Sequence, residues 1–375
     1  MVALRPLALG FGFVAALAFA APTAGCGDGG SGGFSPTGGA GGAGGSGGGS
    51  SAVPCDGAKP TLDLAGTWAA YGRLDVTLKG IDGGVVTICP ADQIGESTML
   101  LLVTMAHDAA DPTKLVNVGA VLCSIELPIV TALVGVCDVN SQSLVSTQII
   151  APQTLLDALP GVPSAPVSGS LMGTTDGSAL ALDRFVVTVG SKKPGASMPK
   201  WDAASPMCTA TNLGRTDVCE GACVSDCAGL RDDDKDSYPG VTVEVCGKTP
   251  DDVKSGVACN AESPNVPGTT IQGRAFIDME VNPLFTGQAK TSCEIEGTVD
   301  SEVLYNLAGA DIYLAGTQIG VTSAIKSLPS FQVDPTTSRF RMVRIDGQFG
   351  APNWMVDPTQ TLAACSTLVA RQNEL

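Results

Sequence analysis

The sequence predicts a mainly β protein, with antiparallel sandwich or barrel-like regions and a disulfide-rich irregular insert. Three observations lead to this fold class. Short stretches of alternating apolar and polar residues recur along the chain, turn-forming residues separate them, with 47 Gly and 24 Pro among 375 residues, and 13 Cys are present. Since few helical patterns lie between the strands, a wound parallel sheet is excluded.

The charge balance and the lone histidine restrict the function. Asp and Glu outnumber Lys and Arg by 37 to 21, which gives a formal net charge of −16. Electrostatic binding to the phosphates of nucleic acid is therefore excluded as a main activity. His107 is the one histidine, so no multi-histidine metal site can form. Thirteen cysteines favour an oxidising compartment.

Residues 1–26 have the pattern of an export signal. A basic residue precedes an apolar run over residues 7–21, and the tetrapeptide Thr23-Ala-Gly-Cys26 follows. With Cys directly after Ala-Gly, the segment resembles a bacterial lipoprotein signal with its lipobox, although Thr23 stands where Leu is usual. The resemblance implies a lipid on Cys26 that anchors the chain to a membrane. Gly27, in place of an inner-membrane retention Asp, implies an outer membrane or the cell surface. The alternative is a plain secretory signal with Cys26 incidental.

If Cys26 carries lipid, twelve cysteines remain, an even set that can close into six disulfides. These candidates are Cys55, Cys89, Cys123, Cys137, Cys208, Cys219, Cys223, Cys227, Cys246, Cys259, Cys293 and Cys365. Before them, residues 27–54 hold 14 Gly in 28 positions, a composition that predicts a flexible linker between the anchor and the folded part.

Residues 55–200 form the first predicted β-rich domain. Apolar and polar residues alternate over Tyr71–Lys79, and two more apolar stretches, Thr98–Ala106 and Ala181–Val189, predict more deeply buried strands. One short helix is expected at Gln153–Leu159, which ends at a proline.

The stretch Leu115–Val136 is long enough to cross a membrane. Glu126 near its centre and Pro128 speak against a span, and we expect two buried strands in its place. Cys123 and Cys137 are interpreted as disulfide partners there.

The second β-rich region, residues 263–375, returns to the alternating pattern. In Arg274–Val281, Ala275 and every second residue after it face one way, and the others face the opposite way. Similar strands are expected at Ser292–Val299, Ala310–Leu314 and Ser338–Ile345.

Between these regions, the Cys-rich insert 201–262 carries an acidic run. Asp232, Asp234 and Asp236 give the spacing D-x-D-x-D, with which a tightly turning loop aims three carboxylates at one hard cation. Calcium fits such oxygen ligands, with the backbone carbonyl of Tyr238 as a fourth, whereas zinc prefers Cys and His. The run resembles the calcium loops of EF-hand, dockerin and thrombospondin type 3 proteins.

The loop departs from these families at two positions. Ser237 replaces the Gly preferred at the sixth position, and Val243 occupies the twelfth, where an EF-hand supplies Glu; Glu244 is the expected substitute. We therefore expect a weak structural site with a dissociation constant on the order of 10⁻⁴ to 10⁻³ M. A solvated acidic turn without an ion is the alternative.

No catalytic constellation is found, and we expect a protein that is not an enzyme. His107 lacks a G-x-S-x-G partner motif and is interpreted as a solvated turn residue, and the S-x-x-K match at Ser197–Lys200 is a chance one. The sequence thus predicts a membrane-anchored, disulfide-stabilised extracytoplasmic lipoprotein that acts as a structural or adhesive binding module, with an unknown partner that is not nucleic acid.

The alternative function rests on Gly66-Thr67-Trp68, at the start of the first strand. This tripeptide resembles the G-x-W opening of lipocalins, whose barrel holds one small ligand. The resemblance implies a β-barrel that binds an apolar small molecule. A core Trp of an ordinary sheet is the competing interpretation.

Overall fold

The computed structural model describes part of the chain between Cys55 and Leu375. The described residues are Cys55 and residues 61–78, 93–126, 130–133, 146–150, 153–162, 164–202, 224–238, 240–248, 271–314, 317–319 and 331–375. The signal-like segment with Cys26 and the linker 27–54 lie outside them.

Eight strands close an antiparallel barrel. In ring order they are β1 (Gly66–Leu78), β2 (Gln93–His107), β3 (Lys114–Glu126), β6 (Val167–Leu171), β7 (Ser178–Leu182), β11 (Leu284–Thr291), β12 (Glu294–Asp300) and β16 (Arg339–Arg344). Each pairs with the next, and β16 pairs with β1. Ring order follows chain order, so the barrel is of the up-and-down type. The predicted mainly β class is confirmed.

The other strands come from three insertions at one end of this barrel. One follows β3 and holds β4 (Val130–Leu133), β5 (Ser146–Ile150) and the helix α1 (Gln153–Ala158); another follows β7 and holds β8 (Val187–Val189), β9 (Val241–Lys248) and β10 (Ile271–Val281). The third follows β12 and holds β13 (Glu302–Leu314), β14 (Thr317–Ile319) and β15 (Phe331–Val333). Because neighbouring strands alternate in direction, connections after alternate strands emerge at the same end.

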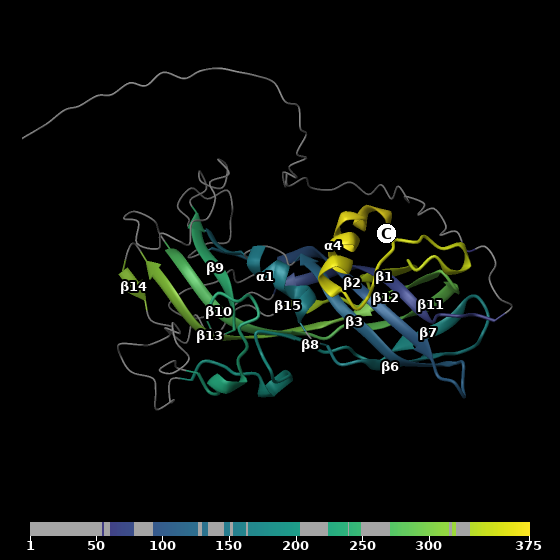
Figure 1. Ribbon diagram of the computed structural model, residues 1–375. Coiled ribbons are helices and arrows are strands. Elements are labelled where there is room, and N and C mark those ends of the chain that lie inside the picture. The colour runs from purple at the N-terminus through teal and green to yellow at the C-terminus, as the bar shows by residue number, and fades with distance from the viewer. Residues whose placement is uncertain are drawn as a thin grey trace, which may run out of the picture. The chain divides into compact units, whose positions relative to one another are not determined.

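The inserted strands pair with one another. They continue the sheet from β1 in the order β15-β13-β10-β9-β5-β4, with β14 beside β13 and β8 beside β10. Figure 1 shows β13, β10 and β9 of this part. Strands from residues 55–200 and from 263–375 therefore hydrogen-bond in one sheet.

Apolar side chains fill the barrel interior. Along β1 the inward residues include Trp68 and Leu74, each at most 1% exposed, and the ring of Phe285 on β11 contacts Phe340 on β16 with centroids 5.0 Å apart. Gly297 leaves the room for this ring, since a Cβ there would lie 2.7 Å from Phe340. An eight-stranded barrel is just wide enough for side chains to fill.

A C-terminal helix covers part of the outside. The helix α4 (Thr361–Ala370) lies against β2 and β3 (Figure 1), and Cys365 in it forms a disulfide with Cys123 of β3. The expected partnership of Cys123 with Cys137 is wrong, because β3 faces the C-terminal helix at this position. A second disulfide joins Cys55 to Cys293. Cys227 is also disulfide-bonded.

Most sequence-predicted elements are confirmed, with two corrections. Two strands, β3 and β4, occupy the stretch 115–136, and α1 forms where a helix was expected. The single strand expected at Ala181–Val189 is wrong: the segment leaves the barrel after Leu182 and re-pairs as β8 with β10. The helix α4 was not expected, because its residues are apolar or small on all sides and give no helical stripe.

Candidate metal centre and the end of the barrel

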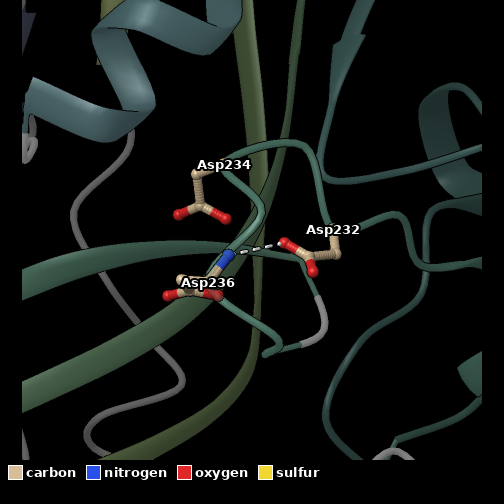
Figure 2. Close-up of side chains that lie close together, drawn as sticks. All are labelled: Asp232, Asp234 and Asp236. Carbon is tan, nitrogen blue, oxygen red and sulfur yellow. Dashed lines mark hydrogen bonds between the residues drawn. The ribbon is translucent and has the colours of Figure 1, made fainter.

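The three predicted aspartates come together in the segment between Cys227–Gly229 and β9. One carboxylate oxygen from each of Asp232, Asp234 and Asp236 lies within 4.8 Å of the others, and Figure 2 shows the carboxylates pointing toward one another. Two oxygens bound to one calcium ion at about 2.4 Å can be at most about 4.8 Å apart. The cluster is therefore of a size that can hold a divalent cation.

Backbone conformation and local hydrogen bonds shape the loop. Lys235 and Ser237 have φ of 58° and 73°, in the left-handed region. Asp232 accepts hydrogen bonds from the backbone N–H groups of Asp236 and Ser237, each 3.1 Å long. Ser237 thus adopts the conformation that favours glycine, although the sequence offers serine there.

The loop is fastened to β9 through Thr242. The backbone N–H of Thr242 donates to Asp234 Oδ2 at 2.8 Å, and its hydroxyl donates to Asp236 Oδ2. Asp234 is 7% exposed, and its other oxygen, Oδ1, has no hydrogen-bond partner in the described part of the chain. Burial, together with the charges of Asp236 and Asp232, raises the pKa of Asp234 to about 6.

This arrangement fits a hard cation. A buried carboxylate oxygen without a donor is costly, and a cation between the three carboxylates would satisfy it and neutralise the like charges. The donor set is all oxygen, which suits calcium better than zinc.

The two other predicted ligands lie nearby but outside the three-residue cluster. Glu244 is on β9, two residues beyond Thr242, in register with Arg274 of β10. The ring of Tyr238 stacks on Phe276 with centroids 4.8 Å apart. Their roles as ligands remain predictions.

The Gly66-Thr67-Trp68 tripeptide starts β1 at the barrel end opposite the insertions. The Trp68 indole is fully buried and donates from Nε1 to the backbone oxygen of Leu64 at 3.0 Å. Arg344, the last residue of β16, lies across it, with its guanidinium carbon 4.9 Å from the Trp68 ring centroid. The ring of Phe349 lies 5.0 Å from the same carbon.

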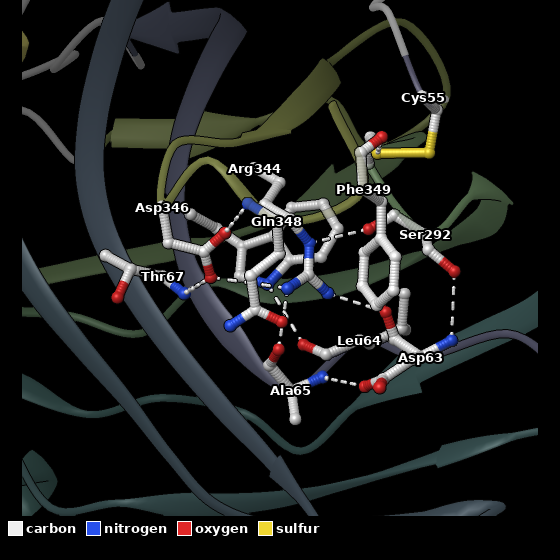
Figure 3. Close-up of polar contacts among 12 residues, drawn as sticks. Cys55, Asp63, Leu64, Ala65, Thr67, Ser292, Arg344, Asp346, Gln348 and Phe349 are labelled. Carbon is white, nitrogen blue, oxygen red and sulfur yellow. Dashed lines mark hydrogen bonds and ion pairs between the residues drawn. A yellow bond between two sulfur atoms is a disulfide. The ribbon is translucent and has the colours of Figure 1, made fainter. Parts of the chain in front are cut away.

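Arg344 is fully buried and closes this end of the barrel (Figure 3). It donates to the backbone oxygens of Ser292, Ala65 and Asp63 at 2.6 to 2.7 Å and pairs with Asp346 at 3.3 Å. Burial lowers its pKa, and the carboxylates of Asp346 and Asp63 oppose this effect. The guanidinium thus joins three segments that are distant in sequence.

Arg344 was not expected as a site residue, although the sequence carries a signal for it. Every second residue of β16 faces inward, and Phe340 and Met342 share this face with Arg344. A charged residue at an inward position of a strand predicts a buried polar network.

His107 is not the solvated turn residue that was expected. It ends β2, and its Nε2 accepts a hydrogen bond of 2.9 Å from the backbone N–H of Leu64. The histidine supports the barrel end.

Comparisons with known proteins give no family for this chain. No family model matches it, and no curated protein matches it. None of the helices in the described ranges is long and apolar enough to cross a membrane.

Proposed function

We propose that the protein is a non-enzymatic module held outside the cytoplasm by a lipid on Cys26 and stabilised by calcium at Asp232, Asp234 and Asp236. The observation that carries the metal part is the carboxylate of Asp234, buried with one oxygen unpartnered and turned toward two further carboxylates. Glu244 and the Tyr238 carbonyl would complete the ligand set.

The proposed location outside the cytoplasm is inferred from the sequence. The lipobox-like tetrapeptide, the Gly-rich linker and an even set of cysteines outside it all suit an exported, anchored protein. The disulfides Cys55–Cys293 and Cys123–Cys365 support an oxidising compartment. We infer attachment to an outer membrane or the cell surface, with the barrel as the part that meets a partner.

Calcium titration of the purified, chelator-treated protein tests the metal site. Calcium binds the folded state, so millimolar concentrations should raise the melting temperature; at tenfold the dissociation constant the stabilisation is about 1.4 kcal/mol. Magnesium at equal concentration should stabilise less, because it requires a near-ideal octahedral shell.

Asp234→Asn separates the metal site from general stability. The amide keeps an oxygen for the Thr242 N–H and removes the buried charge, so the metal-free variant should be at least as stable as the parent. It should no longer respond to calcium. Asp357→Asn, at an exposed turn outside the cluster, is the matched control and should respond like the parent. An Asp234→Asn variant with the parent's calcium response would contradict the site.

A second candidate function follows from the barrel. An eight-stranded up-and-down barrel that opens with Gly66-Thr67-Trp68 is the architecture in which lipocalins hold a small ligand. An apolar small molecule inside would have to displace side chains such as Phe285 and Phe340. Native mass spectrometry of the protein from its own cells tests this function. A defined co-purifying apolar mass would support it, and bare protein mass alone would count against it.

A further inference from the structure

The outer face of the barrel carries two cross-strand rows of side chains. The first row runs Ser170, Ala181, Thr286, Thr298 and Arg339 across β6, β7, β11, β12 and β16. The second runs Ala179, Gln288, Glu296, Arg341 and Tyr71 across β7, β11, β12, β16 and β1. All these residues face away from the core, because their strand neighbours face inward.

These rows line an open hollow of about 870 Å³. Its lining includes the small residues Ala179 and Ala181 and the long side chains of Met172, Lys290 and Arg339. Its volume falls within the range of small-molecule binding sites. It shares no residue with the aspartate cluster or with the Arg344 network.

Arg339 differs from the other cations of this hollow because it forms no ion pair with a described residue. Lys290 pairs with Glu296 at 3.8 Å and Arg341 with Glu294 at 2.6 Å, but no ion pair of Arg339 is found within the described residues. Its cross-strand neighbour on β1 is another cation, Arg73. Arg73 is already paired with Glu96 at 2.9 Å, so of these two cations Arg339 is the one without a carboxylate partner among the described residues.

Polar groups that suit a polyhydroxylated molecule continue from Arg339 along the rows. The hydroxyls of Thr286 and Thr298 lie 3.1 Å apart next to it. Gln288 and Glu296 add an amide and a carboxylate one row further. Tyr71, partly exposed, adds an aromatic ring and a hydroxyl at the edge.

We propose that this hollow binds an acidic saccharide. The Arg339 guanidinium takes the saccharide carboxylate, because its planar fork matches a carboxylate with two parallel hydrogen bonds. The threonine hydroxyls, Gln288 and Glu296 exchange hydrogen bonds with sugar hydroxyls, and Tyr71 packs against an apolar sugar face. The ligand can be a free oligosaccharide or part of a cell-surface glycan.

Titration calorimetry with defined probes tests this proposal. The probes are uronic-acid trisaccharides of the galacturonate and glucuronate series, their neutral hexose counterparts, and inorganic phosphate. At least one acidic trisaccharide should bind saturably and more tightly than its neutral counterpart and than phosphate. Uronate-containing glycan on beads should retain the protein if the source is a surface polymer, and free trisaccharide should release it.

Variants make the test specific. Arg339→Gln should weaken binding of the acidic trisaccharide about tenfold, which is the loss expected for one charge-assisted pair. Binding of the neutral trisaccharide should not change. Thr298→Val should weaken binding of both the acidic and the neutral trisaccharide. Arg184→Gln, which removes a cation paired with Asp300 outside the hollow, is the matched control and should bind like the parent. Melting curves check that each variant is folded.

Three results would overturn the proposal. The first is that no acidic trisaccharide binds saturably. The second is that Arg339→Gln binds the acidic trisaccharide as tightly as the parent does. The third is that phosphate binds as tightly as the acidic trisaccharide. The last result would reduce the hollow to a simple anion contact.

Discussion

Asp278 allows a direct test of how the burial of a carboxylate makes the stability of this protein depend on pH. Its side chain on β10 is 0% exposed, and neither carboxylate oxygen has a hydrogen-bond partner in the described part of the chain. Burial raises its pKa from 3.8 to about 7.

The sign of the pH effect follows from this shift. Because the folded-state pKa lies above the unfolded one, the folded protein binds an additional proton between about pH 4 and pH 7. The contribution of Asp278 to the free energy of unfolding is therefore highest below that window and falls as pH rises through it. A pKa raised from 3.8 to about 7 corresponds to a loss of about 4 kcal/mol. Asp278→Asn, which cannot ionise, should not show this loss.

Urea denaturation at pH 4.5, 6 and 8, with the disulfides intact, measures the effect. The variant's stability relative to the parent should increase with pH and reach its largest gain at pH 8. Taking this difference removes the contributions of the other acids, including Asp234. Asp176→Asn, at an exposed turn between β6 and β7, is the control and should keep the parent's pH profile. A difference between Asp278→Asn and parent that does not change with pH would refute the reasoning.

Four further predictions concern the loop, the barrel end, the helix and the anchor. Ser237→Gly should stabilise the protein by about 0.5 to 1 kcal/mol in urea denaturation, because φ of 73° suits glycine; a loss of stability would contradict the loop conformation. Arg344→Met should lower the free energy of unfolding by about 3 to 5 kcal/mol, since it leaves three buried backbone oxygens without a hydrogen-bond donor. A variant as stable as the parent would show that the network contributes little. Cys365→Ser should lower stability by about 2 to 5 kcal/mol and expose α4 to proteolysis; unchanged cleavage would mean that packing alone holds the helix. Cys26→Ser should move the protein from the detergent phase to the aqueous phase, and a variant that stays in detergent would refute the lipid anchor.

Local patterns predicted strand positions well. The alternation along Tyr71–Lys79 and Arg274–Val281 identified β1 and β10, because a side-chain period of two can be read without tertiary information. The pattern also assigned Asp278 and Glu280 to the polar face of β10. Both are buried, since the inserted segments around residues 190–202 cover that face, as when Gly195 N–H donates to Glu280.

Of the candidate site, the sequence alone determined the three aspartates, because D-x-D-x-D spacing in a turning loop constrains their side chains to one side. The tertiary structure decided what this spacing cannot: that Asp234 is buried, and that Thr242 of β9 binds two of the carboxylates. It also decided the closure of the barrel by β16 against β1, the Cys123–Cys365 disulfide and the Arg344 network. Each joins residues more than 200 positions apart, and such contacts depend on strand order, which local residue patterns do not encode.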